Sequence, residues 1–387
     1  MNHTTGAGIL CVVGARPNFM KIAPLMAAFR KGPNAIPARL LHTGQHYDAA
    51  MKESFFHQLG IPEPDIDLGV GSGSHALQTA EIMKRFEPVL DAECPAAILV
   101  VGDVNSTIAC ALVASKKGIP VIHVEAGLRS YDRGMPEEIN RVLTDQISDL
   151  LFTTERDALG NLEREGVDGT RVIFTGNVMI DTLRQHLERA VPGADTLRAS
   201  GIDPVLLDDS SGYALLTLHR PSNVDDPRVL RRLLETLRTI SEQMPLLFPV
   251  HPRTRARIRE AGFSDLLTSP RIVQLEPLGY LEMLGLMRHA RLVLTDSGGL
   301  QEETTALGVP CITLRENTER PITVEQGTNT VVGTDAEKIL AAVADVLETG
   351  GKRGRVPEYW DGQAAQRIKA FLVEWLAGRD SPVAVAN

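Results

Sequence analysis

The feature that most constrains the fold is a repeated alternation of short β-rich runs with longer helical patterns. In the first half of the chain the β-rich runs are Ile9–Val13, Arg39–His42, Ala97–Val101, Val121–Val124, Leu150–Thr153 and Val172–Thr175. Helical patterns follow the first three of them, near Phe19–Lys31, from about Asp48 and over Ser106–Lys117. This alternation is typical of βαβ units, so it predicts a doubly wound parallel sheet by about residue 180.

A second series of the same kind follows a polar stretch, Pro192–Gly212, which we interpret as the domain junction. Its β-rich runs are Ala214–Leu218, Leu246–Val250, Ile272–Leu275, Leu292–Thr295, Cys311–Thr313 and Thr330–Val332. Because 387 residues also exceed what one core usually organises, we predict an α/β protein with two Rossmann-like domains and a central cleft. The predicted N-terminal domain spans residues 1–180 and the C-terminal domain spans 181–363. The last segment, 364–387, contains a helix that caps the second domain or crosses back onto the first.

Composition excludes several classes of protein. Apolar residues make up 43% and charged residues 23% of the chain, which is ordinary for a globular protein and favours neither disorder nor a membrane class. We find no apolar run of bilayer length and no signal-peptide pattern, so we predict no membrane association and a cytoplasmic location. The formal net charge of −9 argues against nucleic-acid binding, which needs a basic surface.

The strongest phosphate-binding signal follows the run Leu292–Thr295. There the chain passes through Ser297-Gly298-Gly299 into a predicted helix, whose first N–H groups and dipole would favour a diphosphate. Glu303, one turn into this helix, is placed to accept hydrogen bonds from ribose hydroxyls. The alternative interpretation is an ordinary helix capped by Ser297, with acidic residues in its first turn.

Two cations follow the first β-rich run. Arg16 stands at its carboxyl end and Lys21 lies about one helical turn beyond, a placement that suits a phosphate or a leaving group. No Gly-x-Gly-x-x-Gly occurs there, so the sequence indicates no nicotinamide cofactor.

Carboxylates follow two neighbouring strands. Asp103 comes after Ala97–Val101 and Glu125 after Val121–Val124, so both should lie at the same edge of the sheet. Carboxylates that meet in a dry cleft push their pKa values apart, which lets one act as base and another as acid. The alternative for Asp103 is a cap on the next helix, but we favour acid–base chemistry for both residues.

A second acidic pair, Glu137 and Glu138, opens the predicted helix that carries Arg141. For Glu138 we favour a structural ion pair with Arg141 at i, i+3 spacing. In the second half, His219, Arg220 and His251 stand at strand ends. No close pair of metal ligands occurs, so we predict no metal site.

These motifs resemble, in order along the chain, those of the non-hydrolysing UDP-N-acetylglucosamine 2-epimerases. The matching segments are Gly14-Ala15-Arg16-Pro17, Gly44-Gln45-His46, Gly102-Asp103, His123-Val124-Glu125-Ala126-Gly127-Leu128-Arg129, Pro136-Glu137-Glu138-Ile139-Asn140-Arg141, His219-Arg220, Asp296-Ser297-Gly298-Gly299-Leu300-Gln301-Glu302-Glu303 and Glu319-Arg320-Pro321. The resemblance extends from about residue 9 to about residue 370.

The resemblance implies the GT-B fold, a UDP site mainly on the C-terminal half, and interconversion of UDP-GlcNAc and UDP-ManNAc without a cofactor. It also implies a homodimer that supplies precursors for surface polysaccharides. By this resemblance the catalytic residues are Asp103, Glu125, Glu137 and His219. The substrate-binding residues are Arg16, Lys21, Arg220, Ser297, Gly298, Gly299, Glu303 and Arg320. We include the neighbouring Arg141 among them.

The sequence leaves several alternatives open. A proton at C2 of the sugar is not acidic enough for direct removal, so we expect elimination of UDP to a glycal intermediate, followed by re-addition. Tyr47 stands where many members carry an arginine, which puts activation by a second UDP-GlcNAc in doubt. The rival functions are epimerisation of a modified UDP-2-acetamido sugar, glycosyl transfer by a GT-B enzyme, a hydrolysing reaction that releases ManNAc, and sensing without turnover.

Overall fold

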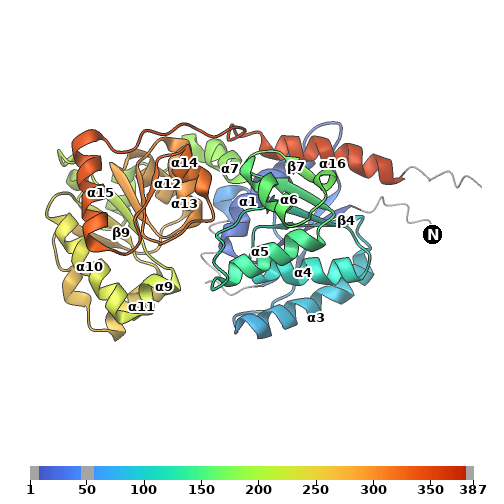
Figure 1. Ribbon diagram of the computed structural model, residues 1–387, viewed down its shortest axis with the longest axis horizontal. Coiled ribbons are helices and arrows are strands. Elements are labelled where there is room, and N and C mark those ends of the chain that lie inside the picture. The colour runs from blue at the N-terminus through green and yellow to red at the C-terminus, as the bar shows by residue number, and fades with distance from the viewer. Residues whose placement is uncertain (1–7, 45–55, 381–387) are drawn as a thin grey trace, which may run out of the picture. The chain divides into compact units, whose positions relative to one another are not determined.

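The computed structural model describes residues 8–44 and 56–380, and Figure 1 shows their arrangement. The chain divides into two compact units. Unit 1 contains the residues up to Thr182 together with those from Glu358 onward, and unit 2 contains Leu183–Pro357. Each unit is built around its own parallel sheet, so the predicted α/β class is confirmed.

The sheet of unit 1 has the strand order β3-β2-β1-β4-β5-β6-β7 over the described residues, and neighbouring strands run parallel. The strands are β1 (Ile9–Val13), β2 (Ala38–His42), β3 (Ile66–Asp67), β4 (Ala97–Val101), β5 (Val121–Ala126), β6 (Leu150–Thr153) and β7 (Val172–Phe174). The helices are α1 (Arg16–Arg30), α3 (His75–Glu93), α4 (Asn105–Lys116), α5 (Pro136–Ile147), α6 (Asp157–Arg164) and α7 (Val178–His186), the last of which leads into unit 2. The strand order reverses between β1 and β4, and ligands bind at such switch points in sheets of this type.

The central strands of unit 1 are apolar throughout. All five residues of β1 and all five of β4 are buried, as expected for a parallel sheet with helices on both faces. On one face Leu10 and Val100 belong to the same core cluster as Phe86 of α3. Along β1 and β4, polar side chains are therefore confined to the loops that follow the strands, whereas β5 carries the buried His123 and Glu125 within the strand.

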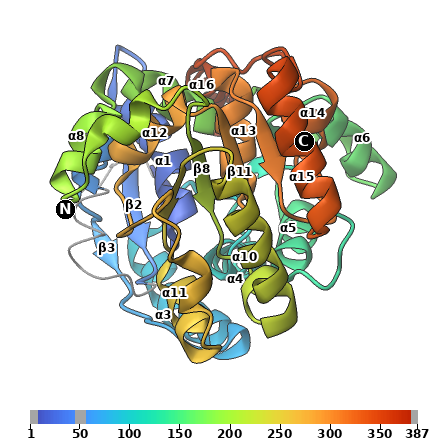
Figure 2. The same cartoon turned by 90° about the vertical axis from the view of Figure 1, so that its left-hand side faces the viewer.

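Unit 2 repeats this plan. Its sheet has the order β10-β9-β8-β11-β12-β13, and Figure 2 shows β8 beside β11. The strands are β8 (Ala214–Thr217), β9 (Leu246–Pro249), β10 (Ile272–Leu275), β11 (Leu292–Thr295), β12 (Cys311–Thr313) and β13 (Asn329–Val331). The helices are α8 (Gly193–Ala199), α9 (Pro221–Val224), α10 (Pro227–Ser241), α11 (Pro252–Glu260), α12 (Tyr280–His289), α13 (Gly298–Leu307), α14 (Pro321–Glu325) and α15 (Ala336–Thr349). Here the switch point lies between β8 and β11.

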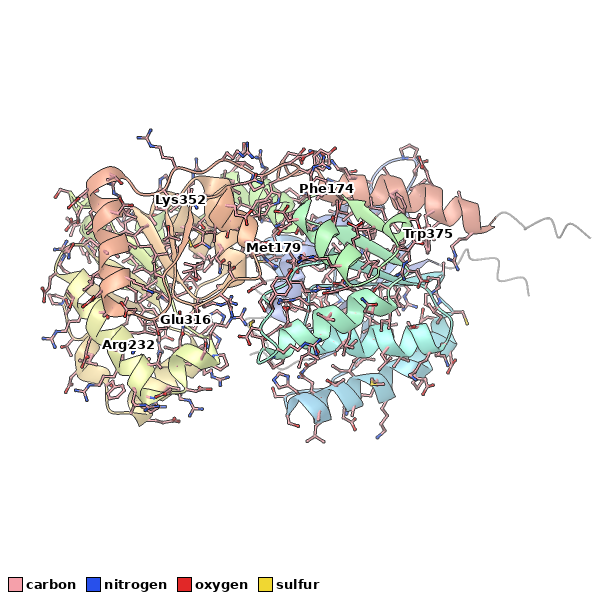
Figure 3. All side chains as sticks on the ribbon, viewed as in Figure 1. Phe174, Met179, Arg232, Glu316, Lys352 and Trp375 are labelled. Carbon is pink, nitrogen blue, oxygen red and sulfur yellow. The ribbon has the colours of Figure 1, made fainter. Side chains whose placement is uncertain are left out.

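Helix α10 illustrates how the second core is assembled. Leu230, Leu233 and Leu237 recur at helical spacing and are buried against the sheet, because this spacing places them on one face of the helix. On its exposed side Arg232, labelled in Figure 3, donates a hydrogen bond to the carbonyl oxygen of Thr334 at 2.9 Å. The apolar face thus fixes the helix on the sheet, and the polar face ties it to the loop before α15.

The polar stretch Pro192–Gly212, interpreted above as the junction, is part of unit 2. It contains α8 and a short 3-10 helix, Pro204–Asp208, and the division between the units falls earlier, within α7. The stretch looked like a linker because Pro, Gly and Asp also begin and cap short helices; Asp203, for example, accepts a hydrogen bond from the N–H of Val205.

The C-terminal helix α16 (Ala364–Asp380) packs on unit 1, where it contacts α1 (Figure 1). The Phe371 ring meets the Phe152 ring of β6 edge-on, with 5.7 Å between centroids. The side chain of Trp360, just before the helix, is fully buried and its indole N–H donates to the carbonyl oxygen of Thr154 at 3.1 Å. Of the two positions left open by the sequence, this helix takes the one on the first unit.

Within the described ranges, no helix combines the length and the apolar character that crossing a membrane requires.

Asp181 of α7 caps the amino end of α16. Its carboxylate accepts hydrogen bonds from the backbone N–H groups of Ala364 (3.1 Å) and Ala365 (2.7 Å). Burial raises the pKa of Asp181 to about 6, although these two hydrogen bonds oppose the shift. Because this pKa is higher in the folded state than in the unfolded state, ionisation of Asp181 weakens the folded state.

We therefore expect the free energy of unfolding of the wild type, relative to Asp181→Asn, to fall as the pH rises from about 4 to about 6. The fall should be on the order of 3 kcal/mol, because the pKa is raised from 3.8 to about 6 and one pKa unit corresponds to about 1.4 kcal/mol. Urea unfolding followed by tryptophan fluorescence measures it, since the two tryptophans of the chain are Trp360 and Trp375 of this C-terminal segment, and Figure 3 labels Trp375.

Asp361→Asn is a control of opposite sign. Hydrogen bonds from Arg367 lower the pKa of Asp361, so the stability that Asp361 contributes is present near neutral pH and is lost as the pH falls through the lowered pKa. Identical pH profiles for the wild type and Asp181→Asn would contradict the assignment of the buried Asp181 carboxyl.

Candidate functional site

The carboxyl ends of β1 and β4 are tied together by Asn18. Its side-chain oxygen accepts hydrogen bonds from the N–H groups of Gly14 and Ala15, both at 3.1 Å, and its amide donates to the carbonyl oxygen of Val101 at 3.0 Å. This side chain fixes the start of α1. Arg16 is the first residue of α1, and its side chain lies outside the described part of the structure.

Lys21 of α1 and Glu125 of β5 form a buried ion pair. Their side chains are only 7% and 2% exposed. Gly102, directly after β4, adjoins this pair: a Cβ atom at that position would lie 2.7 Å from the Lys21 Nζ and 3.1 Å from a Glu125 carboxylate oxygen. Gly102 also has φ +65°, so both the space and the backbone conformation require glycine. Lys21 and Glu125, to which the family resemblance assigns substrate binding and catalysis, are thus in direct contact.

Asp103 is held by Arg141 of α5. The Asp103 carboxylate accepts hydrogen bonds from the Arg141 Nε at 3.2 Å and from a terminal guanidinium nitrogen at 2.6 Å. It does not cap α4, because the N-cap residue is Val104 and no side chain makes the cap hydrogen bond. The capping alternative for Asp103 is therefore not what the structure shows.

Glu138 has a structural role, as predicted. It forms an ion pair with Arg141 at 2.5 Å, and its carboxylate also accepts hydrogen bonds from the N–H groups of Ser130 (2.9 Å) and Tyr131 (2.8 Å). Tyr131 has φ +59°, a conformation that costs energy for a residue with a side chain. Glu138 thus holds a strained loop while Arg141 spans from Glu138 to Asp103. Glu137, its neighbour in the first turn of α5, is half-buried.

The structure thus brings the predicted residues of unit 1 into two cation–carboxylate pairs at the ends of adjacent strands. Lys21 meets Glu125 at the end of β5, and Arg141 meets Asp103 after β4. Gln45, His46 and Tyr47, which also belong to the quoted motifs, lie outside the described residues. In chemical terms unit 1 offers carboxylates for proton transfer, with cations positioned beside them.

In unit 2, Asp296 organises the loop that follows β8. This carboxylate is fully buried, and it accepts hydrogen bonds from the backbone N–H groups of His219 (2.9 Å) and Arg220 (2.8 Å) and lies 2.9 Å from the His219 Nδ1. Burial acts to raise the pKa of Asp296, but the His219 ring and these hydrogen bonds outweigh it, so the pKa lies below its ordinary value. The His219 ring, 37% exposed, is therefore held through Nδ1 and lies 5.6 Å, between centroids, from the ring of His251.

The amino end of α13 begins at Gly298, after Ser297. The Ser297 side chain makes no cap hydrogen bond, so the interpretation of this segment as an ordinary serine-capped helix is not what the structure shows. A Cβ atom at Gly298 would lie 2.3 Å from a carboxylate oxygen of Glu319, so a side chain at this position would displace that carboxylate. A helix end of this kind offers backbone N–H groups and a positive dipole to an anion.

Glu303, the predicted ribose ligand, is nearly buried in α13. The hydroxyl of Tyr280, the first residue of α12, donates a hydrogen bond to it at 2.9 Å. Burial and the neighbouring carboxylate raise the pKa of Tyr280 well above its ordinary value, so this hydroxyl keeps its proton and acts as donor. Tyr280 therefore fixes the orientation of the Glu303 carboxylate.

The remaining predicted cations of unit 2 are paired with glutamates. Arg320 contacts Glu302 at 2.8 Å, and both side chains are buried. Arg220 lies 3.7 Å from Glu319, which also pairs with Arg315 at 2.7 Å. Both predicted arginines thus adjoin the loop and helix that start at Ser297.

Sequence reasoning missed the residues that hold these groups in place. Asp296 could have been recognised, because it directly follows a buried strand and precedes the glycines. Tyr280 gave no signal, since its partner Glu303 lies far away along the chain, and Glu302 stood in a quoted motif without a role of its own. Over residues 8–44 and 56–380, no cluster of three or more His, Cys, Asp and Glu side chains has the arrangement of a metal site.

Comparisons with known proteins place this geometry in a family. A model of the UDP-N-acetylglucosamine 2-epimerase family matches residues 30–373. UDP-N-acetylglucosamine 2-epimerase of Methanocaldococcus jannaschii is 44% identical over 93% of this chain and 97% of its own. UDP-2,3-diacetamido-2,3-dideoxy-D-glucuronate 2-epimerase of Pseudomonas aeruginosa is 40% identical over 95% and 99%.

A solved structure of the M. jannaschii UDP-GlcNAc 2-epimerase, in complex with UDP-GlcNAc and UDP, has a TM-score of 0.85 and 41% identity. The alignment covers 95% of this chain and 99% of that one. This likeness confirms the predicted pair of Rossmann-like domains of the GT-B type.

The contrast between Glu138 and Glu137 predicts a difference in stability. Glu138→Gln should lower the free energy of unfolding by roughly 2–4 kcal/mol, because a buried ion pair and several hydrogen bonds lose their acceptor charge. Glu137→Gln, the same substitution one residue earlier on a half-buried side chain, should cost less than about 1 kcal/mol. Urea denaturation of both variants measures the difference. Equal losses would show that Glu138 does not hold the Ser130–Tyr131 loop.

Proposed function

The chain belongs to the UDP-N-acetylglucosamine 2-epimerase family, and we propose that it interconverts UDP-GlcNAc and UDP-ManNAc by elimination and re-addition of UDP. The observation that carries this proposal is the pair of carboxylates, Asp103 and Glu125, at the carboxyl ends of neighbouring strands, each beside a cation of the same unit. A pure binding site has no need of such carboxylates, whereas proton removal and return require them.

The reaction proceeds in two balanced halves. A carboxylate of unit 1 removes the proton from C2 of the sugar while the bond between C1 and the diphosphate oxygen breaks, so that a C1–C2 double bond forms and UDP leaves with the electron pair. UDP then adds back to C1 as a proton reaches C2 from the opposite face. We assign Asp103, Glu125 and Glu137 as the acid–base set, because Asp103 and Glu125 lie at the carboxyl ends of adjacent strands, Glu137 lies in the first turn of α5, and the family resemblance places all three in the reacting region.

The charge that develops on UDP needs stabilisation. In this proposal Arg16 and the amino end of α13, from Ser297 to Gly299, take the diphosphate, since cations and unpaired N–H groups suit an oxyanion. His219 assists at the diphosphate or in proton transfer, and its fixed Nδ1 leaves Nε2 for that task.

The other binding residues complete the nucleotide site. Lys21 and Arg141 bind the substrate near the reacting carboxylates. Arg220 and Arg320 bind it near the nucleotide, and each of these two arginines contacts a glutamate that lies in or beside α13. Glu303 accepts hydrogen bonds from the ribose, supported by its orientation by Tyr280.

A second candidate is epimerisation of a modified UDP-2-acetamido sugar. It is supported by the P. aeruginosa relative, whose name specifies a diacetamido glucuronate substrate and whose identity to this chain, 40%, is close to that of the M. jannaschii enzyme. Glycosyl transfer shares the nucleotide half of the site but needs a single base, so it is the weaker candidate. Homodimer formation, a cytoplasmic location and supply of surface-polysaccharide precursors are part of the proposal for which the family resemblance is the support.

A proton NMR time course with purified protein and UDP-GlcNAc in deuterated water tests the proposal. We expect UDP-ManNAc with deuterium at C2, because the carboxylate that protonates C2 exchanges with solvent. Unchanged UDP-GlcNAc, together with turnover of UDP-2,3-diacetamido glucuronate, would favour the second candidate. Free ManNAc and UDP would instead indicate a hydrolysing enzyme.

In the same assay, the variants Asp103→Asn and Glu125→Gln should abolish most deuterium incorporation.

The contact between Tyr280 and Glu303 predicts an effect on nucleotide binding. Tyr280→Phe should raise the KM for the UDP sugar by about 10-fold, because a hydrogen bond to a charged group contributes roughly 1.5–3 kcal/mol, while kcat changes much less. Steady-state kinetics measure both constants. Tyr213→Phe is the matched control: this buried tyrosine of unit 2 also loses a hydrogen bond, at 2.6 Å to the carbonyl oxygen of Leu286, so its KM should stay unchanged. An unchanged KM in Tyr280→Phe would remove Glu303 from the ribose site.

A further inference from the structure

His123 of β5 is completely buried, and both of its ring nitrogens face oxygen atoms that only accept hydrogen bonds. The Nδ1 lies 2.7 Å from a carboxylate oxygen of Asp145, and the Nε2 lies 2.8 Å from the carbonyl oxygen of Gly102. A neutral imidazole has one N–H and one lone pair. One of these two short contacts would then place a lone pair against an oxygen, which is repulsive, so both contacts are hydrogen bonds only when each nitrogen carries a proton.

The groups around His123 support the resulting positive charge. Asp145 is fully buried and also lies 2.7 Å from a guanidinium nitrogen of Arg129, whose guanidinium in turn donates to both carboxylate oxygens of Glu165, at 2.6 and 2.8 Å. With His123 protonated, the four side chains of His123, Asp145, Arg129 and Glu165 form a chain of alternating sign with no net charge. A buried charge is tolerated when it is paired and hydrogen-bonded in this way.

The same contacts surround the strained backbone of Glu125. This residue has φ +75° and stands at a shift in the register between β5 and β6. A non-glycine residue in this conformation costs of order 1–3 kcal/mol and persists only where its surroundings enforce it. Asp145 contacts the chain on both sides of Glu125. One of its carboxylate oxygens contacts the His123 ring, and the other accepts a hydrogen bond from the N–H of Gly127 at 3.1 Å.

We propose that His123 is a positioning residue, held as a doubly protonated imidazolium, that ties the Gly102–Asp103 turn to the Glu125 backbone and so keeps the two reacting carboxylates aligned. The role rests on the function proposed above, whereas the protonation state follows from the hydrogen bonds alone. His123 acts through its neighbours: its Nε2 fixes the carbonyl group directly before Asp103, and its Nδ1 fixes the carboxylate that encloses Glu125. Misplacement of a reacting group by about 1 Å can cost on the order of 100-fold in rate.

The protonation state is tested by nitrogen-15 NMR of the wild-type protein labelled at histidine. The ring signals of His123, identified by their loss in His123→Gln, should show two protonated nitrogens at pH 6 and unchanged at pH 8.5. A neutral ring at pH 8.5 would overturn the proposal. This measurement needs no substrate, so its result stands apart from the test of the reaction.

The positioning role is tested by kinetics of His123→Gln, whose amide has one donor nitrogen and one acceptor oxygen and so cannot reproduce both hydrogen bonds. We expect kcat to fall by about 10- to 100-fold while KM stays within about twofold. Asp149→Ala is the matched control, because Asp149 accepts the N–H of Val121 at 2.8 Å and so holds the opposite end of the same strand. It should lower thermal stability and leave kcat unchanged.

Asp145→Asn is a second variant in case His123→Gln does not fold. It keeps the size of the side chain but removes the negative charge, so kcat should fall as in His123→Gln and the His123 ring should lose its second proton near neutral pH. Full kcat in either folded variant, or an equal loss in Asp149→Ala, would overturn the positioning role. A wild type that turns over no UDP sugar would instead contradict the proposed function and leave the NMR result to decide the protonation state.

Discussion

Burial of both faces of the two parallel sheets determines where polar side chains are found in this molecule. Strands such as β1 and β4 are apolar along their whole length, because a polar side chain on either face would lose its hydration without compensation. The chain therefore changes character abruptly where a strand ends, and the residues at that point, such as Asp103 and Asp296, are polar. Both switch points acquire their chemistry from this single constraint.

Buried charges at these strand ends are arranged in opposite pairs. Lys21 with Glu125 and Arg320 with Glu302 are nearly inaccessible to solvent. Such pairs add little net stability, because desolvation consumes most of the Coulomb attraction, but removing one partner is costly. Their effect is to restrict each side chain to one position. The carboxylates are thus oriented before any ligand arrives, which is what acid–base chemistry requires.

The sequence predicted the elements that depend on local pattern and missed those that depend on distant contacts. Strands Leu150–Thr153 and Leu292–Thr295 agree to the residue, because apolar runs bounded by polar residues are visible locally. Strand β3 has only two residues, too few to show a period. The candidate site residues were predicted from motifs. The pairing of Asp103 with Arg141, however, depends on how α5 packs on α4 and β5, and the contact between Tyr280 and Glu303 joins two helices with no shared motif.

The course of the chain through the two units bears on how the protein folds as it is synthesised. Unit 2 is one continuous segment, whereas unit 1 is completed only by residues from Glu358 onward. During synthesis, Thr154 of unit 1 emerges before unit 2. Trp360, whose indole N–H donates to the carbonyl oxygen of Thr154, emerges only after all of unit 2. Contacts between residues so far apart form late and slow the search for the native state. We therefore expect the packing of helix α16 on unit 1 to be the last step of folding.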